Sequence, residues 1–134
     1  MYSARVLDHF QNPRNAGELP GADAEVETQN PACGDILRLS AKLAGNRFDD
    51  VRFLARGCTA SIAAGSALTE LLRGRTVDEA RALRREELVE ALDGLPNESM
   101  HASYLAMDAL KALLARLDAN ASTRDQNSSG TALG

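Results

Sequence analysis

The sequence predicts an α+β fold in which a three-stranded antiparallel sheet packs against a layer of helices. After a short N-terminal helix, apolar residues recur at every second position, which is typical of half-buried strands. From residue 59 onward they recur at helical spacing instead. A run of strands followed by a run of helices favours helices on one face of a sheet, and short loops favour antiparallel pairing.

The N-terminal half is expected to hold one helix and three strands. The helix covers residues 1–10, where apolar side chains recur every three to four positions, and Pro13 interrupts it. Strands are expected over residues 24–30, over residues 35–43 and around residues 51–55. The strand over 35–43 shows the clearest alternation, between leucine or alanine and polar residues.

The C-terminal half is expected to be helical. One helix begins at Thr59 and ends at Gly74, the residue type preferred just after a helix. Thr76-Val-Asp-Glu79 has the pattern of a capping box that opens the next helix. A short helix is expected over residues 86–92, and the last helix runs over about residues 99–117.

Length and composition indicate one compact domain. The chain has 134 residues, enough for one hydrophobic core, and its periodic patterns lie within residues 1–118. Beyond Asp118 the sequence is polar and aperiodic. Residues 119–134 are therefore expected to form a disordered C-terminal tail.

The charge and hydropathy of the chain indicate which classes of partner and which cellular location are expected. The net charge of −4 argues against nucleic acid and anionic membranes, because both bind basic surfaces. No apolar stretch is long enough to span a membrane, and the N-terminus lacks the pattern of a signal peptide. A cytoplasmic protein is expected, in which the thiols of Cys33 and Cys58 are free or metal-bound rather than paired in a disulfide.

Four residues with metal-binding side chains lie at predicted element boundaries: Cys33, Asp35, Cys58 and His101. Cys33 and Asp35 precede the second strand and are close enough in sequence to share a metal. Cys58 begins a helix, where the positive end of the helix dipole favours a thiolate. His101 lies in the first turn of the last helix. The pattern predicts a metal or reactive-thiol site at the ends of these elements.

Each of these residues also has a structural interpretation. A lone cysteine is most often a small buried apolar residue, and a lone histidine near a helix start is most often a surface residue. An aspartate beside a glycine often belongs to a turn. No pair has the tight spacing of a Cys-x-x-Cys metal motif. The residues alone therefore leave the metal site and the structural roles both open.

Five segments lie in order across nearly all of residues 1–118: Phe10-Gln-Asn-Pro-Arg-Asn-Ala-Gly17, Pro31-Ala-Cys-Gly-Asp35, Gly57-Cys58, Thr76-Val-Asp-Glu-Ala80 and His101-Ala-Ser-Tyr-Leu-Ala106. In sequence and spacing they resemble the U-type iron–sulfur cluster scaffold family, which comprises IscU-like proteins and NifU N-terminal domains. The resemblance implies a scaffold that builds a labile [2Fe–2S] cluster from iron and from sulfur delivered by a cysteine desulfurase. Such a scaffold takes iron from an iron donor, passes the cluster to acceptor apo-proteins and is not an enzyme.

The resemblance also implies a ligand set with one member missing. The residues that match the family's cluster ligands are Cys33, Asp35, Cys58 and His101. The family's third cysteine should directly follow the histidine, where this chain has Ala102. An alanine cannot bind metal or carry a persulfide, so both roles of that thiol are missing at this position.

A second departure concerns a chaperone. Where chaperone-dependent members have a Leu-Pro-Pro-Val-Lys segment, this chain has Leu95-Pro-Asn-Glu-Ser99. Because the recognition segment is altered, recruitment of a dedicated Hsp70 partner is not expected.

The retained ligands leave more than one function open. Two thiolates, a carboxylate and an imidazole can hold iron, or Zn²⁺ in the protein as isolated, and Rieske centres hold [2Fe–2S] clusters with two cysteines and two histidines. A homodimer that shares one cluster would supply four thiolates. The first hypothesis is therefore a cluster scaffold or carrier. The second is a non-catalytic relative that binds and modulates the desulfurase, with zinc or no metal. A third, an enzyme with Cys58 as nucleophile and His101 as general base, lacks an accompanying oxyanion motif.

Overall fold

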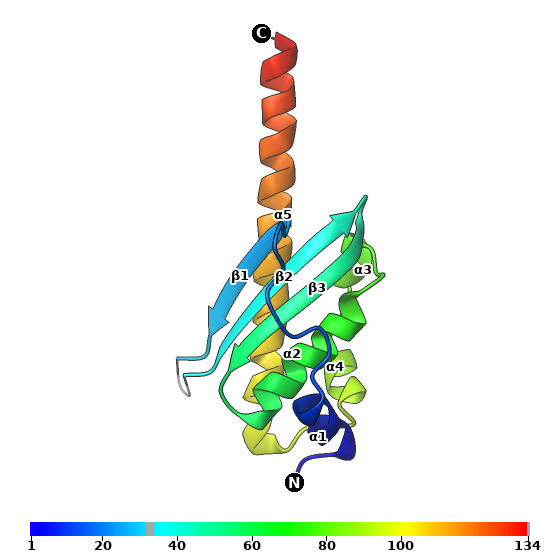
Figure 1. Ribbon diagram of the computed structural model, residues 1–134, viewed down its shortest axis with the longest axis vertical. Coiled ribbons are helices and arrows are strands. Elements are labelled where there is room, and N and C mark those ends of the chain that lie inside the picture. Colours follow the sequence, from blue (N-terminus) through cyan, green and yellow to red (C-terminus); the bar gives the residue numbers. More distant parts are fainter. Residues whose placement is uncertain (32–33, 134) are drawn as a thin grey trace.

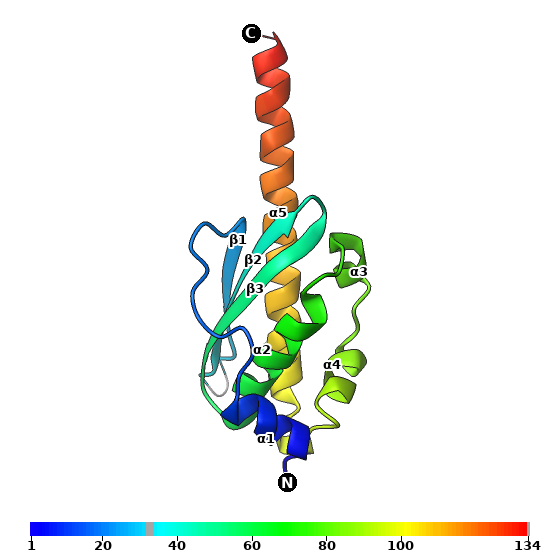
Figure 2. The ribbon, with the colours of Figure 1, turned by 45° about the vertical axis from the view of Figure 1, so that its right-hand side comes forward.

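The computed structural model describes residues 1–31 and 34–133, with side chains described up to Ala121. Its strands form one antiparallel sheet in the order β1-β2-β3, with bounds Ala24–Gln29, Ile36–Ala44 and Arg47–Arg56. The two longest helices, which lie behind one face of this sheet (Figures 1 and 2), are α2 (Thr59–Leu72) and α5 (His101–Leu133). The predicted α+β fold, a three-stranded antiparallel sheet against helices, is confirmed.

Alternation along the strands decides which face of the sheet is buried. Leu39 of β2 pairs with Phe53 of β3, and both side chains point into the helix layer, where they are buried. Their neighbours in sequence, Arg38 and Leu54, point to the opposite face and stay accessible. Burial of the apolar face against α2 and α5 fixes the register, since a slip of one residue would expose it.

The remaining helices pack around α2 and α5. Their bounds are Ala4–Gln11 for α1, Val77–Arg81 for α3, Arg85–Ala91 for α4 and Asn97–Ser99 for the 3-10 turn η1. The predicted capping box is confirmed: Thr76 Oγ1 accepts from the Glu79 amide, and the Glu79 side chain accepts from the Thr76 amide. α1 is held to α2 by a buried hydrogen bond of 2.8 Å between His9 Nδ1 and Ser66 Oγ.

The segment between α1 and β1 runs in front of the sheet in the view of Figure 1. It pairs with the outer edge of β3, where the Gly17 amide donates to Phe53 O and the Phe53 amide donates to Asn15 O. The free edge of β3 is therefore covered along part of its length, while the strand's last residues lie beyond this pairing.

The C-terminal end differs from the sequence prediction. The last helix was expected to end near Leu117, but α5 continues to Leu133, while the expected disorder of residues 119–134 stays a prediction. Among the residues with described side chains, which end at Ala121, Leu117 is the last buried apolar residue, and the later turns of α5 project beyond the sheet (Figure 1). The apolar pattern marked the last buried apolar residue of the described part and not the end of the helix. Once a helix exists, each added residue needs only its own hydrogen bond to extend it. Although α5 has 33 residues, no helix among the described residues is both long and apolar enough to cross a membrane.

Candidate metal centre

The candidate ligands from the sequence lie where several elements begin or end. Asp35 directly precedes β2, Cys58 is the N-cap residue of α2, and His101 is the first residue of α5. Ile36 pairs with Arg56 across β2 and β3, which places Asp35 beside the connection from β3 to α2. Because α5 packs against both α2 and β2, its N-terminus reaches the same place.

The ligand atoms of Asp35, Cys58 and His101 all lie within 4.8 Å of one another. His101 Nε2 is 3.4 Å from Asp35 Oδ2 and 3.7 Å from Cys58 Sγ. One oxygen, one nitrogen and one sulfur donor therefore face a common point. The fold brings together three side chains from distant parts of the chain.

Cys33 and Ala102 are the two other positions that bear on the predicted ligand set. Cys33 lies outside the described residues, so its part in the site stays a prediction. Ala102 follows His101 but is 1% exposed, and its methyl group belongs to the hydrophobic core. Position 102 therefore brings no donor atom to the cluster.

Burial differs across the three ligands. The Asp35 side chain is 7% exposed and the His101 side chain 32% exposed, so the carboxylate forms the inner wall and the imidazole the open side. Burial raises the pKa of Asp35, but hydrogen bonds from Ser61, from the thiol and amide of Cys58 and from His101 outweigh it and hold that pKa below its ordinary value. The carboxylate is therefore charged at neutral pH and suited to bind a cation.

A fourth side chain belongs to this cluster and was missed by sequence reasoning. Ser61 Oγ donates a hydrogen bond of 2.6 Å to Asp35 Oδ2 and lies 3.4 Å from Cys58 Sγ. Ser61 is 1% exposed. A serine in a helix is too common to stand out, and the only available signal was its position three residues after Cys58, on the same helix face.

This donor set fits soft and borderline metals. Thiolate, imidazole and carboxylate ligands together suit Zn²⁺ and iron, and three protein donors leave further coordination positions open. A hydrogen bond to the ligating carboxylate is a usual outer contact of such a site, where it fixes the ligand's orientation. Asp35, Cys58 and His101 could thus hold a metal, with Ser61 orienting Asp35.

Replacing Ser61 by alanine is expected to weaken Co²⁺ binding about 10- to 100-fold, because Asp35 loses the donor that orients it. The dissociation constant would be read from the thiolate-to-cobalt absorption band. Thr59→Ala, on the same first turn of α2, is the matched control and should bind Co²⁺ as the unmodified chain does. Equal affinities for the Ser61 variant and the unmodified chain would show that the serine does not orient the ligand.

The sequence profile of the NifU-like N terminal domain family matches residues 1–123. The chain belongs to this family. It is 47% identical over 111 residues to iron-sulfur cluster assembly scaffold protein IscU 1 of Archaeoglobus fulgidus, covering 83% of this chain and 72% of that protein. It is 40% identical over 118 residues to the scaffold protein IscU of Escherichia coli K12, covering 85% of this chain and 91% of the relative.

Solved structures of the NifU-like family share the fold. The N-terminal part of a NifU-like protein from Brucella abortus superposes with a TM-score of 0.73 at 18% identity, over 87% of this chain and 93% of that one. A putative scaffold protein for the SUF system from Fervidobacterium islandicum gives a TM-score of 0.71 at 22% identity, over 84% and 96%. The sheet and helix layer that position the candidate ligands are therefore a family arrangement.

Proposed function

We propose that this chain is an iron–sulfur cluster assembly scaffold or carrier. It binds a labile [2Fe–2S] cluster, or iron or zinc, as cargo and passes the cluster to acceptor apo-proteins. The proposed ligands are Cys33, Asp35, Cys58 and His101. The chain acts by holding and releasing this cargo, and no catalytic turnover of a small substrate is assigned to it.

One observation carries this proposal: a sulfur, a nitrogen and an oxygen donor meet within 4.8 Å at one end of the family fold. The donors are only partly enclosed, since the imidazole is about one-third exposed. A metal held there stays within reach of a partner protein. Such a site suits a cargo that must arrive and leave more than one that is stored.

Ala102 is proposed to stand where most family members carry their third cluster cysteine. The family resemblance of His101-Ala-Ser-Tyr-Leu-Ala106 supports this alignment. With no thiol at this position, His101 and Asp35 complete the ligand set, as nitrogen donors do in Rieske centres. Replacement of thiolates by a carboxylate and an imidazole favours a cluster that is easily released.

The proposed partners follow from the cargo. Sulfur has to come from a cysteine desulfurase, iron from an iron donor, and the cluster has to go to acceptor apo-proteins. A dedicated Hsp70 is not included, because Leu95-Pro-Asn-Glu-Ser99 lacks the lysine and second proline of the recognition segment in the family resemblance.

Anaerobic reconstitution with iron, cysteine and a desulfurase tests the proposal, with the unmodified chain compared with Ala102→Cys. Both proteins are expected to develop cluster absorption bands, and the variant should lose its cluster more slowly because it adds a thiolate. Ala106→Cys places a thiol one turn further along α5, at a buried position, and controls for an extra cysteine. Bands in Ala102→Cys alone would instead favour a relative that modulates the desulfurase, with zinc or no metal.

A further inference from the structure

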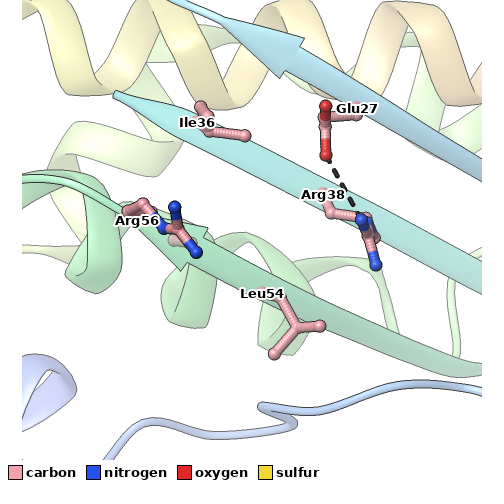
Figure 3. A pocket seen from close by; sticks show the side chains of 6 residues that line it. Glu27, Ile36, Arg38, Leu54 and Arg56 are labelled. Carbon is pink, nitrogen blue, oxygen red and sulfur yellow. Dashed lines mark hydrogen bonds and ion pairs between the residues drawn. The ribbon is translucent and has the colours of Figure 1, made fainter. Parts of the chain in front are cut away.

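The face of the sheet opposite α2 and α5 carries a pocket (Figure 3), and two of its lining residues, Ile36 and Arg56, lie within two positions of the proposed ligands Asp35 and Cys58 in the sequence. Six residues from the three strands line it: Glu27, Ile36, Arg38, Leu54, Ala55 and Arg56. Leu54 is 38% exposed, because its side chain points away from the helix layer that covers the neighbouring Phe53. The pocket lining therefore includes accessible aliphatic surface from Leu54.

The two arginines that line the pocket, Arg38 and Arg56, differ in their contacts. Arg38 Nη2 lies 3.4 Å from Glu27 Oε1, and the two side chains face each other in Figure 3. The exposed Arg56 guanidinium, by contrast, makes no ion pair or hydrogen bond with any part of the chain that the structure describes. Within the described residues, an unpaired positive charge therefore stands beside exposed aliphatic surface.

The position of Arg56 links this pocket to the metal centre. Arg56 precedes Cys58 by two residues and pairs across the sheet with Ile36, which follows Asp35. Side chains alternate along a strand, so Arg56 faces the outer side of the sheet rather than the ligands themselves. A protein seated on the pocket would lie against the edge of the metal centre without occupying it.

We propose that Ile36, Leu54 and Arg56 form a docking surface for an acidic acceptor protein, with a carboxylate on Arg56 and an adjacent aliphatic side chain on Leu54. This inference rests on the proposed scaffold function. A guanidinium pairs with a carboxylate through two parallel hydrogen bonds, and arginine is enriched among the interface residues that carry most of the binding energy. Glu27 already neutralises Arg38, so the pocket matches a single carboxylate rather than a polyphosphate chain.

Charge complementarity explains why an exposed arginine beside the metal centre matters in this chain. The net charge of −4 would repel an acidic partner at most approaches. Arg56 provides a local exception next to the cargo, and local opposite charges raise association rates and orient the partner. The partner would therefore be guided to the end of the sheet where the cluster leaves.

The test uses an acidic apo-ferredoxin of the [2Fe–2S] type as acceptor and compares Arg56→Glu with Arg116→Glu. Arg116 is exposed on α5, on the other layer, and gives the same change in net charge. Cluster loading is measured first by absorbance, and it should be equal in both variants and the unmodified chain. In Arg56→Glu, transfer of the cluster to the acceptor is expected to slow about tenfold or more, and its rate should no longer depend on salt concentration. In Arg116→Glu, the transfer rate should change little.

Binding of the apo chain to apo-ferredoxin is measured separately by fluorescence anisotropy, so that docking is tested even if no cluster loads. The dissociation constant should rise by a similar factor for Arg56→Glu, and Arg56→Lys should recover part of the affinity because it restores the charge but not the bidentate geometry. Unchanged binding in Arg56→Glu, or equal weakening in Arg116→Glu, would overturn the docking surface. Failure of loading in the unmodified chain would count against the scaffold function alone.

Discussion

Replacement of Gly57 by alanine is expected to reduce metal affinity at least about 100-fold. This effect is larger than that of Ser61→Ala, because the Gly57 variant displaces the ligand Asp35 itself, whereas the Ser61 variant removes only a hydrogen bond to that ligand. A Cβ atom at position 57 would lie 2.4 Å from Cγ and Oδ1 of Asp35, far inside van der Waals contact. Moving the Asp35 side chain out of the way costs free energy, because it is buried and hydrogen-bonded to Ser61. The carboxylate must leave its place beside Cys58 and His101.

Backbone strain adds to this clash and has to be separated from it. Gly57 has a backbone φ of +147°, which residues other than glycine rarely adopt. The substitution should therefore also lower the free energy of unfolding by about 1–3 kcal/mol. Gly45→Ala is the matched control: Gly45 has φ of +65°, but a Cβ there would meet nothing within 4 Å. The control should lose stability in urea and keep its Co²⁺ affinity. Equal Co²⁺ affinity in Gly57→Ala would mean that Asp35 is not a ligand.

Replacement of Cys58 by alanine is expected to remove tight binding of Zn²⁺ and Co²⁺ while the fold is kept. Cys58 supplies the sulfur donor of the described cluster, and thiolate ligands contribute strongly to the affinity for these metals. Its side chain is only partly buried, so the lost packing should be small. Zn²⁺ affinity would be measured by competition with a chelator, and the fold by circular dichroism.

His9→Gln is a useful comparison for this experiment, because it perturbs the molecule away from the metal centre. His9 bonds to Ser66 between α1 and α2 and is 7% exposed. Its replacement should lower stability by about 1 kcal/mol or more, the usual effect of leaving a buried partner unsatisfied, without weakening Zn²⁺ binding. If the Cys58 variant bound Zn²⁺ as tightly as the His9 variant, Cys58 would not be a metal ligand and the proposed metal centre would be wrong.

The parts of the fold that could be predicted from the sequence are those set by simple periodicity. Alternation of Leu37 and Leu39 with Arg38 placed β2, and Thr76 with Glu79 placed the start of α3, because each pattern depends on local geometry alone. The end of α5 could not be predicted, because the tail's polar sequence carries no packing signal that marks where a helix stops.

The candidate site was predictable as a set of residues but not as an arrangement. Family resemblance singled out Asp35, Cys58 and His101, yet only the pairing of β2 with β3 and the packing of α5 bring them together. The role of Ser61, and the lack of a partner for Arg56 among the described residues, depend on which neighbours surround each side chain. Such contacts between distant segments are not encoded in any local pattern.

Pulsed electron paramagnetic resonance would show whether one chain holds the cluster with its imidazole as well as its thiolates. The chain would be labelled with ¹⁵N-histidine, loaded anaerobically and reduced so that the cluster becomes paramagnetic. We expect a strong ¹⁵N coupling that disappears in His101→Gln and persists in His9→Gln, and a loaded protein that elutes as a monomer. A loaded protein that elutes as a dimer and shows no nitrogen coupling would contradict this expectation, because four thiolates from two chains would then hold the cluster.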